Sequence, residues 1–590
     1  MDDTKRATIL QRIAELPSGG ITYKTINGKR YAYYQWRENG KQRARRVHDD
    51  ELGQLASQIE ERKELQAQIK QEEHRRDNVR SVDDLHFSTS LRIGEQLVRF
   101  TEPVAKWRKR ACFDMLSEYI YGGTNDRVLV LYGLRRTGKT TLIRQLIWEM
   151  DAEHRARTAF MQVAPGNTLA DVNRDLQLLE HEGFRYLFID EVTFMDDFIE
   201  GAALFSDVFA ASGMKIVLSG TDSLGFLFSE DEQLYDRCTL VHTTFIPYRE
   251  FAGVLGIHDI DEFIRYGGTM SIGGADYNGW GPFSDSASAS AYVDSAIASN
   301  IQHSLKNYRY GGHFRHLREL YDHGELTSAI NRIVEDINHA FTIEVLTRNF
   351  KSRDLGISAK NLRSDRDNPT NILDLIDITG VTKRLKTALE IRDAGERIVA
   401  IDDAIRIEIR EYLDLLDLTV PIDVASLAAP GSVGSITTIA QPGLRYAQAD
   451  ALVESLLGDE TILHLPLADR MRILERIRSE IKGRMMEEIV LLETKKARPA
   501  CNVFKLQLDI GEVDMVVFDK RKAVCELYEV KHSAMRDPRQ CRHLLDEGNR
   551  ERIAFRYGKI VGTYVIYRGE ATEEGIVRYL NVQDYLMSLQ

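Results

Sequence analysis

One octapeptide limits most strongly what this chain can fold into: Gly133-Leu134-Arg135-Arg136-Thr137-Gly138-Lys139-Thr140. It matches the phosphate-loop pattern G-x-x-x-x-G-K-[ST] and directly follows the apolar run 128–132. A strand, a glycine-rich loop and a helix from about Thr141 are therefore predicted, as at the nucleotide-binding edge of a parallel α/β sheet. The alternative is a glycine-containing turn that carries a lysine by chance, and the flanking segments disfavour it.

The residue types of such a loop have separate tasks. Backbone N–H groups converge on the phosphates, the Lys139 ammonium reaches the β and γ phosphates, and the Thr140 hydroxyl binds Mg²⁺. The predicted ATP-binding residues are Gly133, Arg136, Thr137, Gly138, Lys139, Thr140 and Thr141. ATP and Mg²⁺ are thus the expected cofactors.

An acidic motif follows about fifty residues downstream. The apolar run 186–189 ends in Asp190 and Glu191. Alone, such a run is often a buried strand with a solvated acidic turn. After a phosphate loop, it predicts that Asp190 helps to hold Mg²⁺ and that Glu191 polarises the attacking water, so ATP hydrolysis is expected. Ser219 and Thr221 end another apolar run and are candidate γ-phosphate sensors, with a plain strand-end turn as the alternative.

Composition limits the class and the compartment. A chain of 590 residues is too long for one core, so about three to five domains are expected. The net charge of −12 confines nucleic-acid contacts to local basic patches. The five cysteines lack metal-ligand spacing, which predicts reduced thiols. Without a signal peptide or an apolar run of about 18 residues, a cytoplasmic protein with no membrane contact is predicted.

The N-terminal region is predicted to be basic and rich in strands. Residues 19–48 place β-forming residues around Asn27-Gly28 and Asn39-Gly40, which predicts a three-stranded meander. Its cations face a single acid, Glu38, and alternate with aromatic residues, as a nucleic-acid surface would. The candidates are Lys24, Arg30, Tyr33, Trp36, Arg37, Arg43, Arg45 and Arg46. A solvated sheet whose aromatics form its own core is the equal alternative.

Several segments together resemble a known family. They are 133–141, 188–191, 218–222 and Phe245-Ile246-Pro247-Tyr248-Arg249-Glu250-Phe251, and Tyr266-Gly267-Gly268 looks like the family's lid signature. This family comprises prokaryotic AAA-like or STAND-like P-loop ATPases with a helical lid, a winged-helix-like segment and a C-terminal PD-(D/E)XK nuclease-like domain. The resemblance spans about 95–590 and leaves the N-terminal meander uncovered.

The C-terminal part has the element order of the PD-(D/E)XK nuclease core. The patterns predict a helix over 468–494, strands over 503–508, 512–518 and 523–530, a helix near 539–549 and a strand over 560–567. In this order, α-β-β-β-α-β, the second and third strands carry the acids and the lysine that define such nucleases.

The spacing of these residues fits metal-dependent hydrolysis. Glu529 and Lys531 are two apart on one strand and face the same side, and a hairpin partner can bring Asp514 beside them. Two carboxylates then bind Mg²⁺ or Mn²⁺, while Lys531 positions or deprotonates the nucleophile. Glu487 matches the helix acid that completes the metal site in such enzymes. Glu512 is either a further ligand or points away. The alternative for an isolated E-x-K pattern is a surface salt bridge.

The sequence therefore predicts an α/β multidomain chain. Its regions are 1–80, a basic aromatic β-meander and charged helix that serves as a spacer or oligomerisation arm; 90–260, a P-loop ATPase with a parallel sheet; 261–423, a helical lid and winged-helix-like region; 424–466, a linker; and 467–590, a restriction-endonuclease-like α/β domain.

Two functions are expected from this organisation. The first is an ATP-binding and ATP-hydrolysing protein that controls a metal-dependent nuclease acting on DNA, in defence, repair or mobile-element biology. RNA as the substrate and a homo-oligomeric state are left open. The alternative is a signalling or scaffold ATPase whose nuclease-like domain binds nucleic acid or protein without cleaving it.

Overall fold

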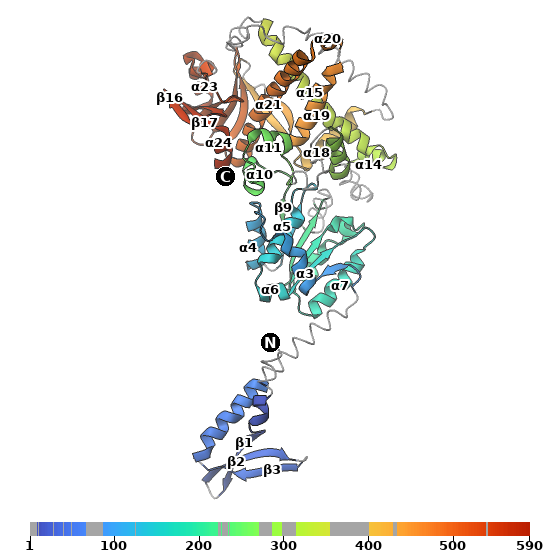
Figure 1. Cartoon of the computed structure of the whole chain (residues 1–590), viewed down its shortest axis with the longest axis vertical. Coiled ribbons are helices and arrows are strands. Elements are labelled where there is room, and N and C mark those ends of the chain that lie inside the picture. Colours follow the sequence, from blue (N-terminus) through green and yellow to red (C-terminus); the bar gives the residue numbers. More distant parts are fainter. Residues whose placement is uncertain are drawn as a thin grey trace. The chain divides into compact units, whose positions relative to one another are not determined.

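A computed structural model describes most of the chain (Figure 1). The described residues are 9, 11–26, 29–38, 41–48, 50–66, 87–123, 126–221, 226, 234, 236–270, 286–297, 314–354, 401–428, 433–458, 460–537 and 541–589. They divide into two compact units, Met1–Phe87 and Ser88–Gln590.

The first unit is a three-stranded antiparallel sheet with a helix on one face. Strands β1 (Gly19–Ile26), β2 (Lys29–Glu38) and β3 (Lys41–Arg46) pair in sequence order, which confirms the predicted meander. The two predicted Asn-Gly turns lie outside the described residues. The helical residues 50–66 bury Leu55 and Ile59 against Ala32 and Val47, so their apolar stripe serves the unit's own core. The rest of the predicted charged helix also lies outside the described residues.

The second unit contains a six-stranded, mostly parallel sheet. Its strands are β4 (Ser90–Arg92), β5 (Val128–Tyr132), β6 (Thr158–Gln162), β7 (Tyr186–Asp190), β8 (Lys215–Gly220) and β9 (Cys238–His242). They are ordered β4-β6-β7-β8-β5-β9, and only β4 is antiparallel to its neighbour. Helices α3 (Gly94–Thr101), α4 (Phe113–Tyr121) and α5 (Lys139–Glu149) cover one face, and β5 is buried throughout. The phosphate-loop helix thus begins at Lys139, two residues earlier than predicted.

Helices follow the sheet, as the periodicity predicts. They are α10 (Tyr248–Leu255), α11 (Ile260–Tyr266), α12 (Ser286–Tyr292), α14 (Arg315–Asp322), α15 (Leu326–Asp354) and α18 (Asp403–Leu415). Leu134 of the phosphate loop is fully buried among α12, α14, α15 and α18. The loop is therefore packed against the helical region as well as the sheet.

The predicted linker over 424–466 is wrong. Strands β10 (Thr419–Ser426) and β11 (Val433–Ile439) form one edge of an eight-stranded sheet, in which β10 pairs with β12 (Asn502–Gln507). Helix α19 (Pro442–Ser455) buries ten of its residues and packs against α11, α15 and α21 (Leu467–Ala497). Its small residues permit close helix packing. The same small residues are also typical of a flexible joint, so the composition alone did not distinguish a packed helix from a linker.

The predicted C-terminal strands are confirmed within one residue at each end. The eight-stranded sheet continues from β12 through β13 (Glu512–Asp519), β14 (Val524–Lys531), β15 (Lys559–Tyr567), β17 (Val577–Asn581) and β16 (Thr572–Glu574). The helix predicted near 539–549 is instead two helices, α22 (Arg542–Leu545) and α23 (Glu547–Tyr557). The break falls at Asp546, whose side chain caps α23 by accepting from the Asn549 N–H.

One buried acid on α21 makes the stability of this unit depend on pH. Glu493 is 4% exposed, and burial raises its pKa to about 8, although its Oε1 accepts a hydrogen bond from the Tyr248 N–H at 2.7 Å. The folded state therefore retains a proton that the unfolded chain releases above its ordinary pKa of 4.5. The stability contributed by the protonated form is complete below pH 4.5 and is lost as the pH rises to about 8.

We therefore expect Glu493→Gln to stabilise the protein at alkaline pH, because glutamine keeps the acceptor and carries no charge. Its unfolding temperature should exceed that of the parent by about 1 °C at alkaline pH, as for about 1 kcal/mol in a unit of this length, and the difference should vanish in mild acid. Differential scanning fluorimetry across pH measures this. Glu475→Gln, at an exposed site on the same helix, is the control. An equal shift at every pH would contradict the titration.

Candidate functional site

The phosphate loop has the backbone that its glycines predict. Gly133 and Gly138 have φ values of 141° and 91°, and a Cβ on Gly133 would lie 2.6 Å from Thr243 Oγ1. The Lys139 ammonium donates to the carbonyls of Gly133 and Leu134, at 2.7 and 2.9 Å. Burial lowers the pKa of Lys139 to about 8, while Glu191 and Asp190 oppose that shift. The lysine is thus held inside the loop by carbonyl groups.

The predicted acids and sensors meet beside this lysine. Thr140 Oγ1 donates to Asp190 Oδ2 at 2.8 Å, and the Ser219 hydroxyl donates to the other oxygen of Asp190. Thr221 Oγ1 donates to Glu191 Oε2 at 3.3 Å. Burial, and then Asp190, raises the pKa of Glu191. The adjacent Thr140 and Asp190 oxygens are ligands of the kind that Mg²⁺ prefers, so the site fits the expected ion.

The other predicted ATP-binding residues occupy different environments. Thr137 is buried and its Oγ1 lies 2.8 Å from Thr243 Oγ1, whereas Arg136 is exposed at a φ of 65°. Thr141 lies half-buried in the first turn of α5. The motif therefore supplies both loop-supporting and solvent-facing side chains.

Sequence reasoning missed Arg110, which holds the loop from outside the motif. Its guanidinium is 6% exposed and donates to the carbonyls of Thr137 and Thr243, at 2.7 and 2.9 Å. Glu250 accepts from Arg110 Nε at 2.6 Å. Glu250 belongs to the segment 245–251 singled out by the family resemblance, which was the available signal for this support.

A second cluster forms where β13, β14 and α21 meet. Lys531 Nζ lies 2.5 Å from Glu529 Oε1 and 3.4 Å from Asp514 Oδ2, which also accepts the Val530 N–H at 2.8 Å. The antiparallel pairing of β13 with β14 brings these residues together. Burial opposes it, but Asp514 and Glu529 raise the pKa of Lys531 well above its ordinary value, so the lysine remains a cation.

Three carboxylates in this cluster could hold a metal ion. Oxygens of Glu487, Glu512 and Asp514 lie within 4.8 Å of one another. Glu512 faces this group because it is two residues from Asp514 on one strand. Burial is the main cause that raises the pKa of both Glu487 and Asp514, with Asp514 and Glu529 respectively adding to it. Such oxygen ligands fit Mg²⁺ or Mn²⁺. Glu529 is not one of these three carboxylates. Lys531 lies beside both Glu529 and Asp514 and so links Glu529 to the group.

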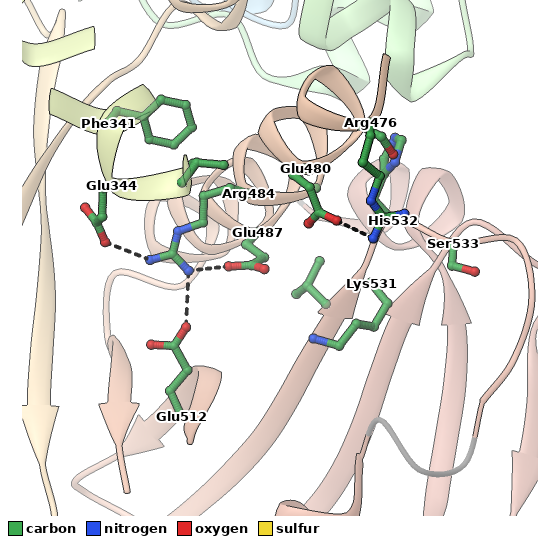
Figure 2. Close-up of a pocket in the computed structure, with 14 residues that line it drawn as sticks. Phe341, Glu344, Arg476, Glu480, Arg484, Glu487, Glu512, Lys531, His532 and Ser533 are labelled. Atoms are coloured by element: carbon green, nitrogen blue, oxygen red, sulfur yellow. Dashed lines mark hydrogen bonds and ion pairs between the residues drawn. The ribbon is translucent and has the colours of Figure 1, made fainter. Parts of the chain in front are cut away.

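The sequence did not identify the basic residues around these acids. Arg484 Nη1 lies 2.5 Å from Glu487 Oε2 and 3.3 Å from Glu512 Oε1, and Figure 2 shows its guanidinium between the two carboxylates. Lys505 is 2% exposed, with Nζ 3.5 Å from Glu487 Oε2. His543 Nε2 lies 2.8 Å from Glu529 Oε2. Only Arg484, three residues before Glu487 on the helix, had a local signal.

A pocket of about 410 Å³ opens onto this cluster. It is lined by Phe341, Glu344, Val345, Arg476, Ser479, Glu480, Gly483, Arg484, Glu487, Glu512, Val530, Lys531, His532 and Ser533. Figure 2 shows the Lys531 ammonium on the same side of the strand as the acids. The pocket gives an extended polar ligand access to the predicted metal ligands.

The structure separates the N-terminal candidates by the face of the sheet. Trp36 stacks on Tyr34 at 5.0 Å between ring centroids, and Tyr34 packs on the helix-side core. Arg43 and Arg45 are paired in register with these two aromatics and share their face. Tyr33 pairs with Arg46 in register, so both belong to the opposite face. Of Lys24, Arg30 and Arg37, only the strand positions are described.

Comparisons with known proteins bear on the first site. A family model for an AAA domain matches residues 125–252, and one for a domain of unknown function, DUF6788, matches residues 2–61. No curated protein matches the chain. The AAA match, together with the loop geometry, shows that the chain contains a P-loop ATPase domain of the AAA type.

Two solved structures resemble the chain distantly. The structure of the Aeropyrum pernix ORC1 protein in complex with DNA is 13% identical, with a TM-score of 0.20 over 62% of this chain and 94% of that one. The S. cerevisiae Hsp104-ADP complex is 10% identical, with a TM-score of 0.22 over 68% of this chain and 56% of that one.

Two further observations concern the whole described chain. No disulfide links any two of the five cysteines, all of which lie within the described ranges. Within the described ranges, no helix combines the length and the apolar character needed to cross a membrane.

Proposed function

We propose that this AAA-type ATPase controls a metal-dependent nuclease of the PD-(D/E)XK type, located at the C-terminal end of the same chain and acting on DNA. The observation that carries the proposal is the cluster of Glu487, Asp514, Glu529 and Lys531, from a helix and two paired strands, beside a pocket that Glu487 and Lys531 line. The order of elements around them supports the nuclease assignment. The proposed nuclease domain includes β10, β11 and α19, so it begins before residue 467.

The residues at the pocket have distinct proposed roles. Glu487, Glu512, Asp514 and Glu529 would hold Mg²⁺ or Mn²⁺, which supplies charge neutralisation and activation of water when bound. The Lys531 ammonium lies between two of these carboxylates and would orient the attacking water beside the scissile phosphate. The hydrogen bond from His543 would keep Glu529 in place, as supporting groups do for metal ligands.

The ATPase residues supply the proposed control. Lys139 and Thr140 would bind the phosphates and Mg²⁺, and Asp190 would share that ion. Glu191 would orient the hydrolytic water, with Ser219 and Thr221 linking the state of the γ-phosphate to the two acids through their hydrogen bonds.

Helix α11 connects the two sites directly. Beyond its C-terminal end, the Met270 N–H donates to the Arg136 carbonyl of the phosphate loop at 2.8 Å. Near its N-terminal end, Asp261 lies 2.7 Å from His532 Nε2, and His532 immediately follows Lys531. Arg568 also contacts Asp261, at 2.8 Å. A helix of seven residues is about 10 Å long, and residues 267–270 complete the connection from this helix to the nucleotide loop.

Helix α19 supports a second connection. The Tyr292 hydroxyl donates to the Arg135 carbonyl of the loop at 3.2 Å, and Gln441 Nε2 donates to that hydroxyl at 3.0 Å. Gln441 precedes α19, and Arg445 in its first turn forms a buried ion pair with Glu488, the neighbour of Glu487. Motion of the loop on nucleotide binding would therefore bias both α11 and α19.

The proposal predicts cleavage that depends on both metal and nucleotide. Purified protein with Mg²⁺ or Mn²⁺ should cut DNA, and ATP should change the rate at least about fivefold. In Asp261→Asn, which removes the charge that faces His532 and Arg568, this ratio should approach one while ATP hydrolysis stays within about twofold of the parent. A time course of DNA cleavage with ATP, with ADP and without nucleotide measures the ratio.

Glu262→Gln is the matched control, because it removes the neighbouring charge on the same helix and should keep the nucleotide effect. If linear, circular and single-stranded DNA all remain intact under every condition, the nuclease proposal is wrong. If the protein cuts RNA and not DNA, the assignment of DNA as the substrate is wrong. If cleavage is observed but is equal with and without nucleotide, only the proposed control is wrong.

One observation favours the alternative of a scaffold ATPase. Arg484 already neutralises Glu487 and Glu512, and in a site that only binds its ligand this cation would replace the metal ion. In that case the parent binds DNA or protein and cleaves neither, and Mn²⁺ does not raise its unfolding temperature.

A further inference from the structure

The N-terminal sheet has an open face on the side away from its helix. Side chains at paired positions share a face, and the face alternates along each strand. The pairs Thr22↔Tyr33, Tyr33↔Arg46 and Gln35↔Ala44 therefore lie opposite Tyr34, which packs on the helix side. The described members of this open face are Thr22, Tyr31, Tyr33, Gln35, Gln42, Ala44 and Arg46.

The open face carries hydrogen-bonding groups and a cation. Gln42 Nε2 donates to Gln35 Oε1 at 3.2 Å, so two amides lie side by side across β2 and β3. The Arg46 guanidinium lies 4.0 Å from the centroid of the Tyr31 ring. None of the described members of the face is acidic, and the three strands together contain a single acid, Glu38. The face is therefore suited to an anionic partner with polar edges.

We propose that this open face binds duplex DNA by entering the major groove. Two neighbouring strand spacings make a three-stranded sheet about 10 Å wide between its outer strands. The major groove of B-form DNA is about 12 Å wide and admits paired strands. The groove therefore admits two of the three strands, such as β2 and β3, which carry Gln35, Gln42 and Arg46, and the positive charge of the sheet matches the phosphates on either side.

The amide side chains of the face indicate recognition of bases as well as phosphates. A glutamine amide can donate to and accept from the major-groove edge of adenine, and an arginine can pair with guanine or with a phosphate. Gln35 lies on the central strand β2, and Gln42 lies beside it near the start of the edge strand β3. Double-stranded RNA presents a deep, narrow major groove that side chains do not reach, so the same face selects DNA.

The opposite face provides a control within the same strand. Arg43 and Arg46 are both exposed on β3, but three positions separate them and their faces differ. Arg45, on the helix side with Arg43, forms an ion pair with Glu51 at 2.8 Å. Binding through the open face therefore depends on Arg46 and not on Arg43, although the two substitutions change the net charge equally.

Fluorescence anisotropy of the full-length protein with a labelled random duplex, in EDTA, tests this dependence. Arg46→Ala should weaken binding at least about fivefold and reduce the salt dependence of the affinity, as for one lost phosphate or base contact. Arg43→Ala should stay within about twofold of the parent. Equal losses in the two variants would indicate general charge attraction and overturn the proposal, as would no loss in either.

A selection from duplexes with a randomised core tests base recognition. The parent should enrich a motif that contains adenine, and the Gln35→Ala, Gln42→Ala double variant should lose that preference by about tenfold or more. Single-stranded DNA and double-stranded RNA of the same sequences should compete poorly. Preferential binding of either competitor, or an unchanged motif in the double variant, would refute major-groove binding.

The inference goes beyond the proposed cleavage and does not depend on it. The binding assays contain no divalent metal and use variants far in sequence from the pocket. Failure of the open face leaves the cleavage assay interpretable, and failure of cleavage leaves the Arg43 and Arg46 comparison valid.

Discussion

Glu529→Gln is expected to lower metal-dependent DNA cleavage at least about a hundredfold while leaving the fold intact. The two oxygens of Glu529 contact Lys531 and His543, at 2.5 and 2.8 Å. Glutamine preserves the volume of the side chain but removes the charge that would hold a divalent ion and keep the lysine between two carboxylates. Lys531→Ala should lower cleavage to a similar degree, because the cation beside the scissile phosphate is lost.

Glu526→Gln is the control for this prediction. Glu526 lies on the same strand, but its partners are Arg498, at 2.5 Å, and the Tyr528 hydroxyl, at 2.9 Å, and neither lines the pocket. Cleavage by this variant should stay within about threefold of the parent, since no reacting group is touched. Far-UV circular dichroism monitors folding of all variants.

A second readout separates loss of metal from loss of activity. Mn²⁺ should raise the unfolding temperature of the parent and raise that of Glu529→Gln less, because ligand binding stabilises the folded state. If Glu529→Gln cleaves DNA at the parent rate, the assignment of this residue is wrong. If the parent cleaves no DNA, and the parent and Glu529→Gln bind DNA equally, the scaffold alternative is correct.

The second large effect concerns ATP. Lys139→Ala should abolish ATP binding, whereas Glu191→Gln should retain binding and lower hydrolysis at least about a hundredfold. The Lys139 ammonium donates to two loop carbonyls, and an incoming phosphate would compete for those hydrogen bonds. Glu191 accepts its hydrogen bond from Thr221, outside the phosphate loop, so glutamine at this position leaves the hydrogen bonds of the loop lysine in place.

Binding of a fluorescent ATP analogue and release of phosphate measure these two steps separately. Lys106→Ala, at an exposed position between β4 and β5, should resemble the parent in both. Hydrolysis that survives in Glu191→Gln would show that another group orients the water. Unimpaired ATP binding by Lys139→Ala would contradict the role of the loop lysine.

The ATP site could be predicted in large part because its geometry is local. Strand β5, the loop and α5 are consecutive, and the glycines at 133 and 138 set the backbone that surrounds a phosphate. Asp190 and Ser219 could be proposed because both stand at the ends of apolar runs. In a parallel sheet these ends meet at one edge, and the structure shows the hydrogen bond between the two residues.

The C-terminal strands could be predicted equally well from the sequence, but the contacts that support the acids on these strands could not. Alternation along β14 predicted that Glu529 and Lys531 share a face and that a hairpin partner can bring Asp514 beside them, while the orientation of Glu512 was left open. Nothing in the alternation indicated that His543, on the short helix α22 between β14 and β15, contacts Glu529. Likewise, the small residues of 424–466 indicated a linker. The structure shows instead that this segment contains a helix packed against α15 and α21 and strands paired in the sheet.

By itself the sequence determined the AAA-type phosphate loop, its acids and the order of elements that carries Asp514, Glu529 and Lys531, because each depends on residues within one strand, turn or helix. The tertiary structure alone decided that Arg110 holds the loop, that Arg484 lies between Glu487 and Glu512, and that α11 joins the loop to the lysine strand. These contacts join residues far apart along the chain or on elements whose relative placement the sequence does not show. They form only when packing of the apolar faces brings their helices and strands together.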